Sequence, residues 1–258
     1  MDRRASERKK IMASDKESLR FQDSQVAVLC GGRGTRLRPT TDVIPKALVQ
    51  LNGRPILDYV LNFYRSKGLS RFILCVGYKA EMVRAHYAEP PSGANICFSD
   101  AGEDASMLQR VWALRGLIEE RTIVSYCDTF IDLDLGHMLE RHLEKRASVT
   151  IVTAKIRNPF GLVAFDTEGW VTSFVEKPIM NYYIGSFILD RAALEHVTPD
   201  MLQKPDGQGL VEFFVTLASE QRLAVFEHEG PQITFNTESE RRNAEEALGR
   251  FYTYSEES

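Results

Sequence analysis

The sequence predicts an α/β protein: a single Rossmann-like domain in which helices cover both faces of a mostly parallel mixed sheet. Two observations lead to this class. Over the first two thirds of the chain, short apolar runs typical of buried strands alternate with amphipathic stretches typical of helices. The chain has 258 residues, of which 43% are hydrophobic, and this suits one large α/β domain. We expect residues 1–24 to form a flexible charged tail and residues 25–258 to form the domain.

The first strand is expected at residues 26–30, where an apolar run leads directly into a group of glycines. Pro55 opens a helix with an apolar face, and Gly68 has the position of a C-terminal cap. Strand and helix signals then alternate. Further strands are predicted at 72–76, 95–98, 122–126 and 149–153, and further helices at 80–87, 107–118 and 135–145.

The pattern changes after Lys155. Two strand-like runs at 161–165 and 171–175 flank a polar turn that ends in glycine, which predicts a hairpin. No linker separates this part from the rest, so we expect it to elaborate the same sheet. The remaining expected elements are strands at 184–189 and 223–226, a helix at 210–218 and a final helix that Thr237 and Glu240 introduce as a capping box.

The composition argues against several classes of function. A net charge of -4 gives no general attraction to nucleic acid, and no apolar run approaches the ~20 residues of a membrane span. We therefore expect a cytoplasmic protein without a nucleic-acid or membrane partner. The four cysteines form no C-x-x-C pair, which favours reduced, buried thiols over a zinc site.

The most informative segment is G-G-R-G-T-R-L-R-P at residues 31–39, followed by Pro45 and Lys46. Glycines directly after a strand let backbone N–H groups approach a phosphate chain, and Arg36 adds a charged fork for phosphate oxygens. The segment lacks the spacing of a P-loop, and its prolines argue against the helix that a dinucleotide-binding loop would open. The sequence thus predicts a cradle for a triphosphate, with a plain glycine-rich turn as the alternative.

This segment resembles the signature of the sugar-1-phosphate nucleotidylyltransferases, G-G-x-G-T-R-L-x-P-x-T followed by P-K, with Thr40 or Thr41 as the final threonine. The resemblance extends from Val26 to about Phe251. It implies a glycine loop that closes over a nucleoside triphosphate. The residues that would bind the nucleotide are Leu29, Gly31, Gly32, Gly34, Thr35, Arg36 and Lys46.

A second stretch, F-V-E-K-P at residues 174–178, resembles the F-x-E-K-P element of the same family. There, Glu176 would hold the sugar hydroxyls and Lys177 the sugar phosphate. By itself, an adjacent Glu-Lys pair is more often a solvated pair at the end of a strand. Gly161 and Gly185 match glycines near the family's substrate, although a β-bulge would also explain a glycine at either position.

Asp128 follows an expected central strand and resembles the aspartate that binds Mg²⁺ in this family. A carboxylate at the C-terminal edge of a parallel strand is placed to ligate a hard cation. The alternative is an aspartate that only caps the strand end. The family's second metal-binding aspartate is matched here by Asn236, whose neutral carbonyl oxygen predicts a weaker contact or none. Mg²⁺ is the expected cofactor.

The resemblance implies that an oxygen of a sugar 1-phosphate attacks the α-phosphorus of a nucleoside triphosphate, which gives an NDP-sugar and pyrophosphate. Arg36, Lys46, Asp128 and Lys177 are the expected catalytic residues. The run V-S-Y-C-D at 124–128 is most similar to glucose-1-phosphate cytidylyltransferases, which favours CTP with a hexose 1-phosphate. Thymidylyl, uridylyl and guanylyl transfer remain alternatives.

A different alternative is a regulatory protein that binds nucleotide sugars and has weakened catalysis. It is motivated by Asn236 and by the absence of glycine from residues 106–110, where relatives usually have one. The intact glycine loop favours the enzyme. Whether the protein forms a homo-oligomer is left open.

Overall fold

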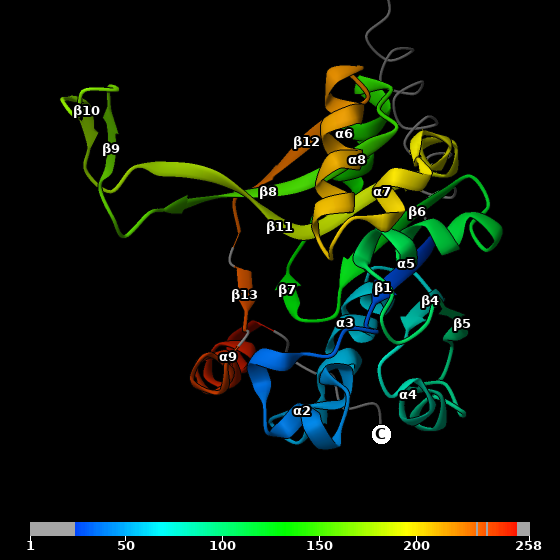
Figure 1. The fold of residues 1–258 in the computed structure, drawn as a ribbon. Helices are drawn as coiled ribbons and strands as arrows, with labels where there is room; N and C mark the ends of the chain where they lie inside the picture. Colours follow the sequence, from blue (N-terminus) through cyan, green and yellow to red (C-terminus); the bar gives the residue numbers. More distant parts are fainter. Residues whose placement is uncertain (1–23, 231, 236, 252–258) are drawn as a thin grey trace, which may run out of the picture.

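The computed structural model describes residues 24–230, 232–235 and 237–251. Its centre is a seven-stranded sheet with the order β12-β8-β11-β6-β1-β4-β5 (Figure 1). Neighbouring strands run parallel except at β11, which is antiparallel to β6 and β8. This confirms the expected α/β class. The strands are β1 (Gln25–Leu29), β4 (Arg71–Val76), β5 (Asn95–Asp100), β6 (Arg121–Tyr126), β8 (Val149–Arg157), β11 (Ile179–Asp190) and β12 (Leu223–His228).

Alternate residues of β1 enter two separate apolar cores, one on each face of the sheet. Val26 and Val28 belong to the first core, and Ala27 and Leu29 to the second. Because both faces are covered, this strand is apolar throughout. The first core also contains residues of α3 (Ile56–Ser66), α4 (Ala80–His86), α6 (Leu135–Lys145) and α9 (Glu238–Phe251), and the second contains residues of α5 (Met107–Ala113), α7 (Pro199–Gln203) and α8 (Gln208–Ser219).

The chain between β1 and α3 forms only short elements, as its prolines predict. β7 pairs with β13 and thereby brings a C-terminal segment to the end of β6. The short elements are η1 (Thr35–Leu37), α2 (Thr40–Val43), η2 (Lys46–Leu48), β2 (Gln50–Leu51), β3 (Arg54–Pro55), η3 (Leu114–Gly116), β7 (Thr129–Ile131), η4 (Arg191–His196) and β13 (Gln232–Thr234).

The final helix begins where the sequence predicts it. The backbone N–H of Glu240 donates to Thr237 Oγ1 at 3.2 Å, which confirms Thr237 as the cap of α9. In the described part of the chain, no helix combines the length and the apolar character needed to cross a membrane. Apart from Ser24, the expected N-terminal tail lies outside the described residues.

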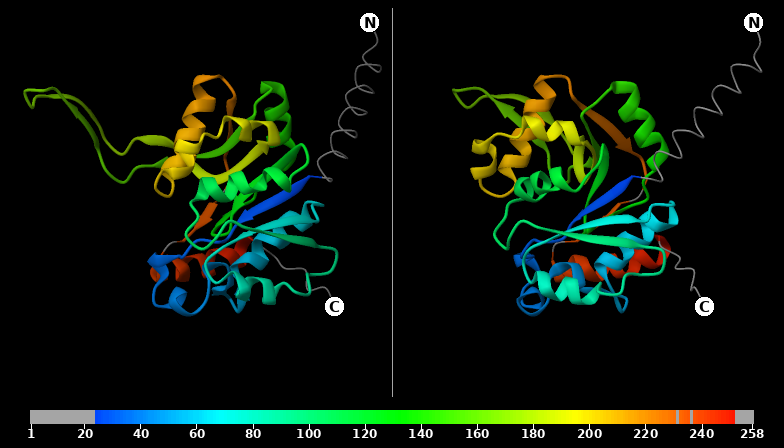
Figure 2. Two further views of the ribbon diagram at one scale, coloured as in Figure 1. Left: turned by 45° about the vertical axis from the view of Figure 1, so that its right-hand side comes forward. Right: turned by 90° about the vertical axis from the view of Figure 1, so that its right-hand side faces the viewer.

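Two strands are longer than expected and carry a projection. β8 and β11 run beyond the sheet as a paired ribbon and lead to β9 (Leu162–Phe165) and β10 (Val171–Val175). We call residues 156–182 the arm, which stands away from the body in all the views of Figures 1 and 2. The expected hairpin is confirmed. The expectation that this part extends the main sheet is wrong for β9 and β10, because the ribbon carries them away from it and they pair with each other.

All four cysteines are free, but they differ in burial. Cys30, Cys75 and Cys127 are buried as expected, and burial raises the pKa of the Cys75 thiol to about 12. Cys97 is exposed, so the expectation of a buried thiol is wrong there. It lies on β5, an edge strand of the sheet, where fewer elements cover the side chains.

Candidate active site

The ends of two neighbouring parallel strands, β1 and β6, form one side of a cavity of about 640 Å³. β1, β4 and β6 lie side by side, and their carboxyl ends lead to Gly31, Gly77 and Asp128 respectively. Loops that leave parallel strands meet at this edge, which is where open α/β sheets bind ligands. The position of the cavity therefore follows from the order of the strands.

The glycine loop fits tightly at its start and turns at Gly34. A Cβ added to Gly31 would lie 2.5 Å from the backbone carbon of Val76 and 2.6 Å from its oxygen, so no larger residue fits there. Gly34 has φ 60°, in the left-handed region that favours glycine. Thr41 Oγ1 donates to the carbonyl oxygen of Gly34 at 2.9 Å. Thr41, rather than Thr40, is the threonine that holds the loop.

Lys46 and Asp128 form an ion pair at the wall of the cavity. Lys46 Nζ donates to Asp128 Oδ2 at 2.6 Å and to the carbonyl oxygen of Phe235 at 3.2 Å. The two charged side chains are only 12% and 21% exposed, so water screens their attraction less than at an open surface. Arg36 lines the same cavity, is exposed and forms no ion pair with a described residue, which leaves its guanidinium available for an anion.

A buried arginine lies beneath the glycine loop. Arg110 of α5 is 4% exposed, and its guanidinium occupies the space that side chains at Gly31 and Gly77 would fill. Arg110 Nη1 donates to the oxygen of Val76 at 2.6 Å, and Nη2 donates to the oxygen of Glu103 at 3.2 Å. Burial lowers the pKa of Arg110. Among the described residues it has no carboxylate partner in an ion pair, so it adds positive potential to the cavity that it lines.

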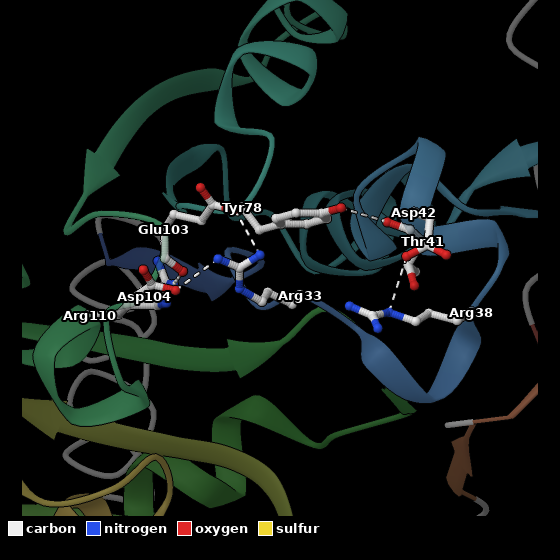
Figure 3. A network of polar contacts seen from close by, with 8 residues as sticks. All are labelled: Arg33, Arg38, Thr41, Asp42, Tyr78, Glu103, Asp104 and Arg110. Atoms are coloured by element: carbon white, nitrogen blue, oxygen red, sulfur yellow. Dashed lines mark hydrogen bonds and ion pairs between the residues drawn. The ribbon is translucent and has the colours of Figure 1, made fainter.

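Ion pairs connect the glycine loop to the loop before α5 (Figure 3). Arg33 Nη1 lies 2.9 Å from Glu103 Oε1, and Nη2 lies 2.9 Å from Asp104 Oδ1. The guanidinium carbon lies 5.2 Å from the centre of the Tyr78 ring, and Tyr78 Oη donates to the oxygen of Thr41 at 3.0 Å. We call Arg33, Glu103 and Asp104 the clasp.

The structure brings most of the expected nucleotide-site residues together. Gly185, with φ 81°, lies at an irregularity of β11 and also lines the cavity, so the bulge and the site coincide at this residue. Thr35 lies in η1 between two lining residues but does not itself line the cavity, and Asn236 lies outside the described residues. The expected residues that line it are Leu29, Gly31, Gly32, Gly34, Arg36, Lys46, Asp128 and Gly185.

The expected sugar-phosphate residues lie elsewhere, on the arm. Glu176 Oε1 and Lys177 Nζ are 3.7 Å apart, and their side chains are 63% and 55% exposed. Gly161 lies against Phe174 and Glu176 in the same hairpin. These three residues therefore lie near one another but outside the cavity.

Comparison with known proteins gives the family. The family model described as nucleotidyl transferase matches residues 25–226. The chain belongs to the nucleotidyl transferase family. It is 27% identical over 240 residues to a glucose-1-phosphate cytidylyltransferase of Salmonella typhi, covering 80% of this chain and 88% of that protein. It is 30% identical over 220 residues to the mannose-1-phosphate guanyltransferase beta-A of Xenopus laevis, covering 79% and 58%.

A solved structure shares the fold of this chain. The crystal structure of HddC from Yersinia pseudotuberculosis is 24% identical, covers 87% of this chain and 99% of that one, and has a TM-score of 0.64. The family and the class of enzyme expected from the glycine loop are confirmed. The names of these two relatives specify different bases and different sugars.

Two aspartates line the cavity of this nucleotidyl transferase, Asp128 and Asp206, and Asp206 Oδ1 accepts a hydrogen bond from the backbone N–H of Met107 at 2.8 Å. No group of three or more Cys, His, Asp or Glu side chains suited to a metal occurs among the described residues. Mg²⁺ is commonly held by one or two carboxylates together with substrate phosphates and water, and Asp128 at the cavity wall fits that arrangement. Asp128 would therefore hold the ion together with bound phosphates.

Sequence reasoning missed two basic residues of this site. Arg110 was considered only as part of the stretch without glycine at 106–110, and Arg33 only as a variable position of the glycine motif. Ser106 in that stretch instead forms a capping box with Gln109, which starts α5 and sets the direction of Arg110. The sequence did contain a signal for Arg110. Gly31 and Gly77 both follow strands, and because neither has a side chain, the space between them can hold the guanidinium of a long side chain such as that of Arg110.

Proposed function

We propose that the protein condenses a nucleoside triphosphate with a sugar 1-phosphate to form an NDP-sugar and pyrophosphate. The observation that carries this proposal is the cavity at the ends of β1 and β6, where a glycine loop, Lys46, Arg36 and Asp128 converge. Backbone N–H groups and fixed cations at one edge suit a chain of phosphates. The names of the relatives support the same pair of substrates.

In this proposal the protein aligns two anions and offsets their charge. Lys46 contacts the α-phosphate, where negative charge accumulates during the transfer, and Arg36 contacts the pyrophosphate that leaves. The attacking oxygen of the sugar phosphate is already ionised at neutral pH, so no general base is required. Mg²⁺, held by Asp128 and the phosphates, would supply further neutralisation of charge. Lys177 contacts the sugar phosphate.

For the base, we propose CTP as the preferred nucleotide and a hexose 1-phosphate as its partner. The support is the V-S-Y-C-D run at 124–128, which leads from β6 into the cavity at Asp128. The similarity to a protein named glucose-1-phosphate cytidylyltransferase over 80% of the chain supports the same choice.

The test is pyrophosphate release with Mg²⁺, in which CTP, UTP, dTTP, GTP and ATP are each combined with a panel of hexose, aminohexose and heptose 1-phosphates. We expect release only when both substrates are present, and the highest kcat/KM with CTP and a hexose 1-phosphate. Release from nucleotide alone would contradict a transferase. Nucleotide binding without release across the panel would favour the regulatory alternative.

A further inference from the structure

The arm presents an unusual amount of apolar surface. On a monomer, contiguous exposed apolar patches are commonly no larger than a few hundred Å² and often mark interaction sites. Every residue of β9 and β10 is exposed, including the aromatic side chains of Phe165 and Phe174. The large apolar residues of the arm that are at least half exposed are Phe160 (75%), Leu162 (50%), Phe165 (69%), Trp170 (71%), Val171 (63%), Phe174 (64%) and Ile179 (58%).

An isolated two-stranded hairpin is at best marginally stable in water, so a partner surface is needed to explain this one. The arm stands clear of its own body in the three orientations shown (Figures 1 and 2). Four aromatic side chains of the arm are more than half exposed: Phe160, Phe165, Trp170 and Phe174. Together they would bury about 400–700 Å² in a contact, close to the ~800 Å² per partner of a stable interface.

The base of the arm lies at the cavity of its own chain, whereas the far part of the arm lies outside it. Tyr182 and Ile156 line the cavity, whereas Lys177 does not. The five residue-to-residue steps from Lys177 to Tyr182 span roughly 16 Å when extended. Pairing of Ile179 with Arg157 and a 2.8 Å hydrogen bond from the Asn158 amide to the Pro178 oxygen keep the ribbon extended over this length. These pairs oppose a return of Lys177 to the cavity of its own chain.

We propose that the arm packs against a second copy of this chain and places Glu176 and Lys177 at the cavity of that copy. The inference rests on the proposed function, because it takes Lys177 to be the residue that binds the sugar phosphate. A second copy is the partner that the site itself requires: each cavity lacks the two arm residues, and each arm carries them away from its own cavity. A two-fold arrangement satisfies both cavities with one kind of contact.

The test is complementation between two inactive chains. Lys46→Ala and Lys177→Ala chains are co-expressed with different affinity tags, and the mixed dimer is isolated by both tags. If the arm acts in the other subunit, one of the two sites in the mixed dimer has both lysines, and about half of the wild-type pyrophosphate release returns. If each arm serves its own cavity, neither site is complete and the mixed dimer stays inactive, which overturns the proposal.

The single variants separate this inference from the proposed function. If both are inactive alone and the mixed dimer is also inactive, the proposed function stands and the shared site is wrong. If Lys46→Ala alone retains full activity, the proposed function loses its main residue. If Lys177→Ala alone retains full activity, the shared site is wrong, because the arm then contributes nothing to catalysis.

Light scattering on the full-length chain tests the contact independently. We expect a dimer or a larger assembly at assay concentration, and a Phe165→Ser/Trp170→Ser double variant that dissociates at least about ten-fold more readily and loses activity on dilution. The matched control is Val215→Ser, which removes an apolar side chain of 61% exposure from α8 on the body and leaves assembly unchanged. A fully active monomeric wild-type protein would overturn the proposal.

Discussion

The cavity and the arm hold charged residues in opposite physical settings. In the cavity, Lys46 and Asp128 are mostly buried and are held by each other and by Phe235. On the arm, Glu176 and Lys177 are mostly exposed and lie in a hairpin that packs on no part of the main sheet. A site that binds two substrates can thus hold the residues for one substrate in place before binding, as in the cavity. The residues for the other substrate, here on the arm, can be positioned by contact with a second chain.

The largest effect is expected at Lys46. Replacing it with alanine removes the cation next to the proposed α-phosphate and leaves Asp128 without its ion pair, so we expect kcat to fall by at least about 10²–10³-fold. The measurement is steady-state pyrophosphate release. The matched control is Lys67→Ala, which breaks the pair between Lys67 and Asp132, away from the cavity, and should leave the rate unchanged. Near-normal activity of the Lys46 variant would remove Lys46 from the mechanism.

The tight start of the glycine loop predicts a difference between two adjacent glycines. Gly31→Ala places a methyl group against the backbone of Val76 and the guanidinium of Arg110, and we expect a loss of about 1–3 kcal/mol in the free energy of unfolding. Gly32→Ala meets no atom within 4 Å and should leave the stability unchanged. Urea denaturation of both variants makes the comparison. Equal stabilities of the two variants would show that the backbone of Val76 and the side chain of Arg110 can shift to accommodate the methyl group at residue 31.

β11 connects the arm to a buried network at its other end, and this network predicts a pH dependence. Burial opposes ionisation of Asp190, but hydrogen bonds from His142 and Arg121 outweigh it and lower the pKa of its carboxyl. A lowered folded-state pKa contributes stability above the unfolded value of about 3.9, and this contribution is lost as the pH falls through the folded value.

Asp190→Asn should therefore flatten the fall in the free energy of unfolding between about pH 5 and pH 3. Denaturation curves at a series of pH values measure this slope. Asp132→Asn, at an aspartate whose side chain is 61% exposed, is the control and should keep the wild-type slope. An unchanged slope in Asp190→Asn would mean that this carboxyl does not anchor β11.

The smallest effect is expected at the clasp. Arg33 and its partners Glu103 and Asp104 are 43%, 49% and 85% exposed, and exposed ion pairs contribute little free energy. We expect Arg33→Ala to raise the KM for the nucleotide by about two- to five-fold with little change in kcat. Steady-state kinetics at varied nucleotide concentration tests this. A large fall in kcat would instead make Arg33 part of the catalytic machinery.

Local sequence signals predicted the body better than the arm. Apolar runs and capping residues located the strands of the sheet and the start of α9, because buried periodicity and caps are encoded locally. The runs at 155–157 and 179–183 were not predicted as strand, because polar or aromatic residues interrupt their apolar pattern. Residues 179–181 pair with 155–157 beyond the body of the sheet, while Tyr183 packs against the second core. Their pairing depends on tertiary context, which local patterns do not contain.

The same limit applies to the site. The glycine loop, Lys46 and Asp128 could be predicted because the motif is local and strand order brings its parts to one edge. The placement of Glu176 and Lys177 outside the cavity could not be predicted, because a motif gives residue types and not the path of the chain around them. Arg110 was missed for a related reason: its guanidinium fills a space that two distant glycines create together.

The central claim is that the cavity binds the nucleotide and the arm binds the sugar phosphate, and removal of the arm tests it most directly. Ile179 pairs with Arg157, so residues 158–178 can be replaced by a two-residue Asn-Gly turn that joins these strands. We predict that this variant binds the nucleotide with the Kd of the wild-type protein, measured by titration calorimetry, and releases no pyrophosphate when a sugar 1-phosphate is added. Turnover at the wild-type rate would contradict the account, because it would show that the cavity of the body is a complete site.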